Sequence, residues 1–421
     1  MTARNVLAGL DALLPGLEEL YRDLHAHPEL SFAERRTAAE LARRLTGYQV
    51  RTGIAGTGVL GVLRNGPGPT VMLRADIDAL PVEERTGLDY ASTVRAPGAG
   101  GTEVPVMHAC GHDMHATWLS GAANLLAAAR EYWSGTLLVV FQPGEEAGDG
   151  AEAMVRDGLF EVAGKPDVVL GQHLVPGGAG WVLTRPGMIM AATDARRIVL
   201  HGRGGHGARP ETTVDPVVLA ASVVLRLQTI VSREIAATES AVVTVGSLRA
   251  GTVHNVISDR AELEVSIRTF DEAVRRKVLA AVERIVRGEA AAAGTPEPPE
   301  IIPIASFGAT VNDEAANARL TGTFRGHFGG ERVLDAPLVT GSEDFGEYGR
   351  VAGVPSVFWL VGGMDTAAVV DALAAGTFER DIPSNHSPRF APVLHPTLRT
   401  GVETLVVAAL EFLAVPGPVA G

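Results

Sequence analysis

The chain has 421 residues and a formal net charge of −13. This length exceeds the usual size of one compact domain and predicts about two. The acidic balance excludes the dense Lys and Arg clusters that bind nucleic acid backbones, so no nucleic acid partner is expected.

Cys110 is the only cysteine in the sequence, which excludes an intrachain disulfide. The N-terminal stretch mixes acids with leucines at helical spacing, and it lacks the basic start and continuous apolar run of a signal peptide. No stretch reaches about 18 uncharged apolar residues, so neither a membrane span nor a membrane partner is expected. These features together predict a cytoplasmic protein.

Strands that alternate with helices predict an α/β fold. After a helix over the first 40 residues come four strand-like runs that end in polar residues, at 70–73, 136–141, 167–170 and 354–360. Helical patterns precede the second and third of these runs, at 116–132 and 151–159. This order predicts a mostly parallel sheet with helices on both faces. Ligands of such sheets bind outside the carboxyl ends of the strands, where the sequence places Asp76, Asp78, Glu145, Glu146 and His173.

The middle of the chain has a different order of elements. It predicts a strand at 195–202, a helix at 215–233, strands at 241–249 and 261–269, a helix at 271–293 and a strand at 300–306. This β-α-β-β-α-β order is typical of a ferredoxin-like unit. Asp215 and Asp271 can cap the two helices. We therefore expect a catalytic domain formed by residues 1–185 and 310–421, with a lid domain inserted at 186–309.

The stretch 107–117, MHACGHDMHAT, is the densest in potential metal ligands: His108, Cys110, His112, Asp113 and His115. Thiolates and imidazoles are common donors for zinc and related metals. Cys110 and His112 are two residues apart, so an extended segment would direct both to the same side. The alternative interpretation is a solvated polar loop.

The stretch 141–147, FQPGEEA, places Glu145 and Glu146 at a strand end, where adjacent carboxylates are also typical of a solvated turn. Beside a metal cluster, one glutamate can bind a cation while the other takes a proton from water, because a divalent cation lowers the pKa of water toward about 7. His173 and His386 are weak signals alone. With Cys110, His112 and Glu146, they make five donors, which suits two metals with a shared ligand.

Seven motifs of this chain, in this order, resemble the M20 metallopeptidase family: LRADIDALPVEE, MHACGHDMHAT, FQPGEEAGDGAEAMVRDG, HGRGGHGARPETTVDP, GTVHNVISDRAELEVSIRTF, TGSEDF and NHSPRF. The resemblance runs from about Tyr21 to Phe390. It is strongest to the amidohydrolase branch, with its hippurate hydrolases, N-acyl-amino-acid aminoacylases and auxin-conjugate hydrolases.

The resemblance implies a role for each matching residue. Cys110 takes the metal-bridging position, and His112, Glu146, His173 and His386 take the other ligand positions. Glu145 takes the general-base position, and Asp78 orients a ligand. In the lid, His206 matches the residue that supports the reacting carbonyl, and Asn255 and Arg268 match residues near the substrate carboxylate. Many relatives carry other residues where this chain has Glu211 and His254, which leaves the substrate preference open.

We therefore expect a metal-dependent amidohydrolase that cleaves N-acyl amino acids or similar small amides with a carboxylate. Two divalent ions per chain are expected, zinc or manganese first and cobalt or nickel as alternatives. A homodimer or higher homo-oligomer through the lid is expected. Three alternatives remain: a dipeptidase or carboxypeptidase on the same fold, a cysteine hydrolase with Cys110 paired to His108 or His112, and a binding module without catalysis.

Overall fold

The computed structural model describes residues 2–98 and 100–414 and divides the chain into two compact units. The first unit comprises Met1–Ile189, Val311–Pro337 and Asp344–Gly421, and the second comprises Met190–Thr310 and Leu338–Glu343. Residues 1, 99 and 415–421, which the predicted helix and domain bounds include, lie outside the described residues. The segment Leu338–Glu343 belongs to the second unit, and the lid bounds predicted from the sequence do not include it.

The first unit contains an eight-stranded sheet. Its order is β1 (Gln49–Ile54), β2 (Gly58–Asn65), β6 (Gly135–Gln142), β3 (Thr70–Asp76), β7 (Val168–Gly178), β18 (Ser356–Met364), β8 (Val182–Thr184) and β17 (Val333–Asp335). The central strands β6, β3, β7 and β18 are parallel, whereas β1 and β2 add antiparallel pairs at one edge. The prediction of an α/β fold with a mostly parallel sheet is confirmed.

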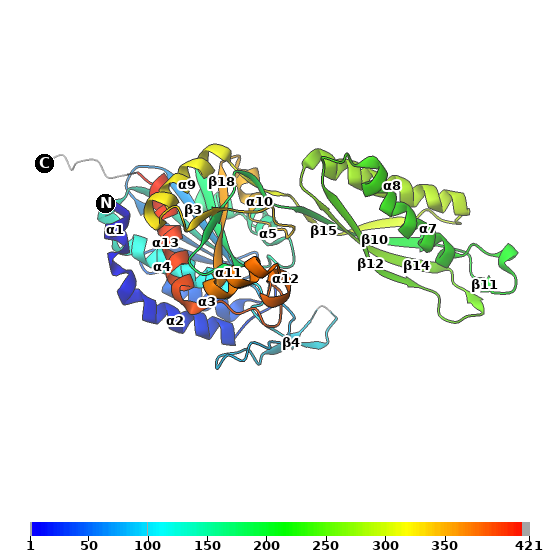
Figure 1. Cartoon of the computed structure of the whole chain (residues 1–421), viewed down its shortest axis with the longest axis horizontal. Coiled ribbons are helices and arrows are strands. Elements are labelled where there is room, and N and C mark those ends of the chain that lie inside the picture. Colours follow the sequence, from blue (N-terminus) through cyan, green and yellow to red (C-terminus); the bar gives the residue numbers. More distant parts are fainter. Residues whose placement is uncertain (1, 99, 415–421) are drawn as a thin grey trace. The chain divides into compact units, whose positions relative to one another are not determined.

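Helices cover both faces of this sheet, with α4 and α13 on one side and α5 and α10 on the other (Figure 1). The helices of the first unit are α1 (Thr2–Val6), η1 (Leu7–Gly9), α2 (Leu10–Ala26), α3 (Arg35–Arg44), α4 (His112–Ala128), η2 (Arg130–Tyr132), α5 (Gly150–Arg156), α6 (Leu159–Ala163), α9 (Glu314–Phe328), α10 (Gly346–Ala352), α11 (Thr366–Ala375), α12 (Phe378–Asp381) and α13 (Leu394–Phe412). Alternate residues of β3, Val71, Leu73 and Ala75, are buried in the core that α2, α4 and α13 share. The period of two directs Met72 and Arg74 to the other face. Two-sided burial explains why the central strands are continuous apolar runs.

Three predicted helices are interrupted, and the one predicted at 116–132 divides at Ala129 into α4 and η2. The first 40 residues form α1, η1, α2 and part of α3 rather than one helix, because the chain leaves helical geometry between Ala26 and Arg35. Pro28 explains the break, since a residue before proline disfavours helical angles. The predicted helix 151–159 divides at Gly158, whose φ is 86°. The remaining short elements are β4 (Arg95–Pro97), β5 (Glu103–Pro105), β9 (Gly187–Met190) and β16 (Thr310–Asn312).

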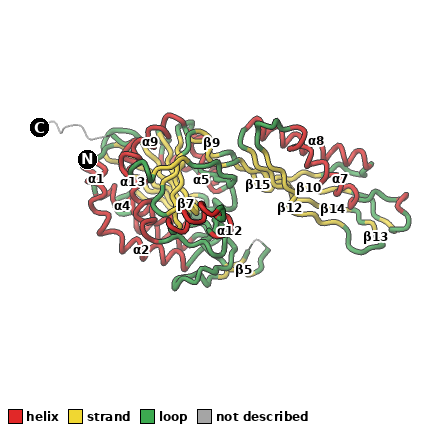
Figure 2. The backbone as a smooth tube through the Cα atoms, viewed as in Figure 1, coloured by secondary structure: helices red, strands yellow, loops and turns green. Residues whose placement is uncertain are grey.

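The second unit is a four-stranded antiparallel sheet with two helices (Figure 2). Its elements are β10 (Ala192–His201), α7 (Pro216–Thr229), β12 (Ala241–Ala250), β14 (Arg260–Thr269), α8 (Glu272–Ala293) and β15 (Glu300–Phe307), in the sheet order β12-β14-β10-β15. This is the predicted ferredoxin-like topology. Asp215 and Asp271 each accept two backbone N–H groups, so both predicted caps are confirmed.

Helix α7 continues into the π-helical turn η4 (Ile230–Glu234). Among the described residues, the combined helix Pro216–Glu234 is the one that is long and apolar enough to cross a membrane by length and composition. Its residues Leu219, Val223 and Leu227 are buried in the core of the second unit, as expected for a helix that covers a sheet.

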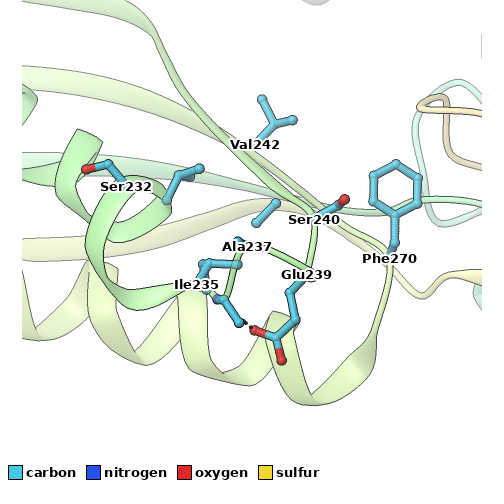
Figure 3. Close-up of a pocket in the computed structure, with 10 residues that line it drawn as sticks. Ser232, Ile235, Ala237, Glu239, Ser240, Val242 and Phe270 are labelled. Atoms are coloured by element: carbon cyan, nitrogen blue, oxygen red, sulfur yellow. Dashed lines mark hydrogen bonds between the residues drawn. The ribbon is translucent and has the colours of Figure 1, made fainter.

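A pocket of about 570 Å³ lies between the end of this helix and the start of β12, with Ile235, Val242 and Phe270 in its wall (Figure 3). No residue predicted for the functional site lines this pocket, so it is separate from the predicted chemistry.

Candidate metal centre

The structure brings the predicted ligands of the first unit together from distant parts of the sequence. Cys110 lies in a turn, and His112 is the first residue of α4. The turn depends on Gly111, which has a φ of 85° and whose Cβ, if present, would come within 2.6 Å of the Leu174 side chain. The expected extended segment is therefore wrong. Glu145 and Glu146 follow β6, His173 lies within β7, and His386 lies in the loop between α12 and α13.

The side chains form overlapping groups of three donors. Cys110, His112 and His173 form one group, and Cys110, Glu146 and His386 form another, with the ligand atoms of each group within 4.8 Å of one another. Cys110 Sγ lies 3.4 Å from His173 Nε2, and Glu146 Oε1 lies 3.2 Å from His386 Nε2. Because both groups share Cys110, the arrangement suits two cations with a common thiolate ligand.

The residues fit a divalent cation on further grounds. His112 Nε2 and Glu146 Oε1 are buried, and neither has a hydrogen-bond partner among the described residues. Burial of a polar atom without a hydrogen bond lowers the stability of the folded state. Burial, followed by the charges of Glu146 and Glu145, raises the pKa of the Cys110 thiol well above its usual value. A cation bound to these donors would satisfy the unpaired atoms and favour the thiolate.

Asp78 orients the His112 ring. Its Oδ1 lies 3.1 Å from His112 Nδ1, while its Oδ2 accepts hydrogen bonds from Ser31 Oγ at 2.7 Å and from the Glu146 amide at 3.0 Å. Burial by itself raises the pKa of Asp78, but these bonds from His112 and Ser31 lower it below its usual value. The charged carboxylate accepts the proton of His112 Nδ1, while His112 Nε2 lies 3.7 Å from Asp76 Oδ2 and 3.9 Å from Glu146 Oε1.

The His173 ring is oriented by the backbone. Its Nδ1 donates to the carbonyl of Leu174 at 2.7 Å, so Nε2 presents its lone pair toward Cys110. Burial holds the pKa of His173 well below its usual value, so the ring is neutral, as metal coordination requires.

The sequence did not predict the pairing of Asp76 with His115. The two side chains are 2.6 Å apart, and His115 Nε2 accepts the backbone N–H of Leu174 at 2.7 Å. Both nitrogens of His115 are therefore occupied, which removes it from the set of available donors. Asp76 also accepts from Arg74, whose guanidinium is buried between Asp76 and Asp344.

Of the other two donors of the 107–117 stretch, Asp113 is paired elsewhere, whereas neither ring nitrogen of His108 has a hydrogen-bond partner among the described residues. Asp113 accepts from His25 at 2.7 Å, and His25 also contacts Glu84 at 3.0 Å. Burial lowers the pKa of His108 to about 4, so this ring is neutral. The imidazole in contact with the Cys110 thiol is that of His173, not that of His108 or His112. Burial raises the pKa of the thiol and so keeps it protonated. These observations count against the cysteine hydrolase alternative, which needs an activated thiolate.

In the second unit, His206 and Asn255 lie together. β11 (Gly205–His206) pairs with β13 (Val256–Ile257), and the Gly207 amide donates to the Asn255 carbonyl at 2.9 Å. His206, His254 and Glu211 are exposed, and Glu211 lies 3.5 Å from Arg209.

Arg268 lies at the other end of the second unit. It is at the Thr269 end of β14, whereas β13 precedes the Arg260 end of that strand. β14 has 10 residues, so at ~3.3 Å per residue its ends are about 30 Å apart. One copy of the second unit therefore does not bring Arg268 together with His206 and Asn255.

The surroundings of Arg268 suit an anion. Its guanidinium donates to Ser342 Oγ at 2.6 Å and to Thr193 Oγ1. Burial lowers the pKa of Arg268, and no ion pair of Arg268 is found in residues 2–98 and 100–414. A half-buried guanidinium without an acidic partner favours the binding of a carboxylate from a ligand.

Comparisons with known proteins agree with this geometry. The chain is 36% identical over 367 residues to an N-acetyl-L-cysteine deacetylase of Bacillus subtilis, an alignment that covers 85% of this chain and 82% of the relative. It is 40% identical over 279 residues to a hippurate hydrolase of Campylobacter jejuni, an alignment that covers 65% of this chain and 70% of the relative.

A solved structure of a dinuclear metal-binding peptidase of the M20 family, from Bacillus subtilis, matches with a TM-score of 0.74 and 29% identity, over 96% of this chain and 99% of that one. The family model described as peptidase family M20/M25/M40 matches residues 72–372. This protein belongs to peptidase family M20/M25/M40.

Proposed function

We propose that this protein is a metal-dependent amidohydrolase that cleaves N-acyl amino acids or similar small amides with a free carboxylate. The observation that carries the proposal is the pair of three-donor groups that share Cys110, in which His112 Nε2 and Glu146 Oε1 are buried without a hydrogen bond in the described part of the chain. The names of the deacetylase and hippurate hydrolase relatives support the same substrate class.

In this proposal, the residues of the first unit have separate roles in metal binding and in proton transfer. Cys110, His112, Glu146, His173 and His386 hold two divalent cations, zinc or manganese before cobalt or nickel. When bound, the cations acidify water and polarise the amide carbonyl. Glu145, which is buried beside Glu146, takes the proton of the attacking water and returns it to the leaving amine. Asp78 keeps His112 in its productive orientation.

The second unit supplies the contacts to the substrate in this proposal. Arg268 binds the carboxylate, because it is half-buried and without an acidic partner in the described part of the chain. His206 supports the oxyanion and Asn255 approaches the carboxylate. Since the length of β14, about 30 Å, separates Arg268 from the end of the second unit that carries these two residues, they serve the same small substrate only from a second copy.

A homo-oligomer through the second unit is therefore part of the proposal. Leu225 and Val218 on α7 are 72% and 62% exposed, and β12 is an edge strand that carries the exposed Val242 and Leu248. Exposed apolar residues beside an unpaired edge suit association with a second copy. Analytical ultracentrifugation should show an oligomer that Leu225→Glu weakens, and a monomeric wild type with full activity would contradict this arrangement.

The proposed activity is tested with metal-stripped protein to which zinc, manganese, cobalt or nickel is returned. N-acyl amino acids, their carboxamides and dipeptides are compared as substrates. We expect metal-dependent hydrolysis that is fastest on the N-acyl amino acids. Preference for dipeptides would favour the peptidase alternative, for which the M20 peptidase structure is the supporting likeness. Hydrolysis that resists chelation, or binding without turnover, would overturn the proposal. The single cysteine supports a cytoplasmic location, which cell fractionation would test.

A further inference from the structure

Asn385 joins the three segments of the chain that carry Cys110, His173 and His386. Its Nδ2 donates to the carbonyl of Cys110 at 3.2 Å and to the carbonyl of Leu174 at 3.0 Å. The same Nδ2 also lies 3.8 Å from Cys110 Sγ, so three acceptors surround its two hydrogens. Because the two nearest partners are carbonyls, which only accept hydrogen bonds, only the nitrogen of the amide can face them.

The Leu174 carbonyl has a second function at the metal centre. It also accepts the Nδ1–H of His173, which directs His173 Nε2 toward Cys110. Asn385 therefore fixes the carbonyl that fixes the His173 ring. At the same time it holds the backbone of Cys110, from which it is 275 residues distant in sequence.

The backbone of the next residue needs such support. His386 has a φ of 70°, in the left-handed region that residues other than glycine rarely adopt. A residue held there costs of the order of 1 kcal/mol and persists only where its surroundings impose it. The His386 amide donates to the Ala109 carbonyl at 2.8 Å, next to the bond between Asn385 and Cys110. These bonds hold the exposed His386 side chain beside Glu146.

We infer that Asn385 is a positioning residue of the metal centre, which sets the places of Cys110, His173 and His386 without binding a cation itself. The inference rests on the proposed function, because it assumes that these three residues are ligands. An aspartate of the same shape at this position would lack both donors and would place a carboxylate against two carbonyls. The effect on cation affinity should match that of other residues that orient ligands, about 10- to 100-fold.

The experiment compares Asn385→Asp and Asn385→Ala with a matched control, Asn65→Asp. Asn65 makes the same kind of bridge, because its Nδ2 donates to the carbonyls of Arg130 at 2.7 Å and Trp133 at 2.5 Å. Neither of these carbonyls belongs to a segment that carries a predicted ligand. The affinity of each metal-free protein for Zn²⁺ is measured by competition with a chromogenic chelator, and the Tm is measured without metal.

Both Asn385 variants should raise the Kd for Zn²⁺ by about 10- to 100-fold. Asn65→Asp should lower the Tm while its Kd stays at the wild-type value. If the Asn385 variants lower the Tm and leave the Kd unchanged, Asn385 is only structural and the inference fails. Asn385→Ala adds no charge, so it keeps the test valid if Asn385→Asp does not fold. A wild-type protein that binds no Zn²⁺, Mn²⁺ or other divalent cation would instead overturn the proposed function.

Discussion

Replacing Glu145 with glutamine should stop turnover and leave the cations in place. Ligand atoms of Glu145, Glu146 and His112 lie within 4.8 Å of one another, so both carboxylates reach the same region of the site. Glutamine keeps the shape of Glu145 but cannot accept a proton at neutral pH. The loss should therefore be at least the ~10²–10⁴-fold that general acid–base catalysis contributes, or about 2.7–5.5 kcal/mol of barrier.

Glu146→Gln should lose bound cations, in contrast to Glu145→Gln, which should keep them. Glu146 Oε1 lies 3.2 Å from His386 Nε2 and 3.9 Å from His112 Nε2, so its negative charge is placed between two imidazoles. Glutamine removes this charge and should reduce cation occupancy. The bond from the Glu146 backbone to Asp78 remains, so the loop should keep its place. Excess metal should partly restore activity.

The assay measures metal content by elemental analysis and turnover by steady-state kinetics on both variants. Retained metal with collapsed turnover in Glu145→Gln, and the reverse in Glu146→Gln, is the expected result. If Glu145→Gln loses its metal while Glu146→Gln retains it, the two roles are exchanged. If neither variant loses activity, the reasoning about this pair is wrong.

Three further predictions concern other parts of the chain. Arg268→Ala should lower kcat/KM for N-acyl amino acids by the equivalent of about 1.5–3 kcal/mol and hardly change kcat/KM for their carboxamides. Equal losses on both kinds of substrate would exclude a contact between Arg268 and the carboxylate. Gly401→Ala should lower the free energy of unfolding by about 1–3 kcal/mol, because a Cβ at this position overlaps the buried Trp118 ring. Gly322→Ala has open space around its Cβ and should raise the free energy of unfolding by about 1 kcal/mol, and urea denaturation measures both changes. Burial raises the pKa of Glu34 from 4.5 to about 7, so the folded state binds this proton more tightly and loses stability as the pH rises from about 4.5 to 7. The stability of Glu34→Gln relative to wild type should therefore increase by about 3 kcal/mol between pH 4.5 and pH 7. A difference in stability that does not change with pH would contradict the raised pKa of Glu34.

The fold was largely predictable from the sequence because its strands are apolar runs with polar ends. Met72 and Leu73 lie in the predicted strand, and Asp76 and Asp78 follow them as expected. The M20 resemblance is also confirmed. The antiparallel strand β1 was not predicted because it is almost fully exposed and lacks an apolar pattern, whereas β2 was missed although it is a buried run of apolar residues.

The candidate site was predictable in its residue types but not in its pairings. The sequence places His108, Cys110, His112, Asp113 and His115 within one short stretch. It does not show which imidazoles have both nitrogens occupied, because those bonds depend on tertiary contacts. His115 is excluded as a donor by the backbone N–H of Leu174. Since any residue except proline carries that N–H group, the side chain at this position gives no signal.

The discontinuity of the first unit has a consequence for biosynthesis. During translation, the segment with Cys110 and His112 emerges well before Asn385 and His386, and the whole of Met190–Thr310 is made in between. The donor group of Cys110, His112 and His173 is therefore complete early in synthesis, whereas the group of Cys110, Glu146 and His386 is completed only near its end. The second group can hold its cation only after Met190–Thr310 has been made, so the Cys110 thiol must stay reduced until His386 is added.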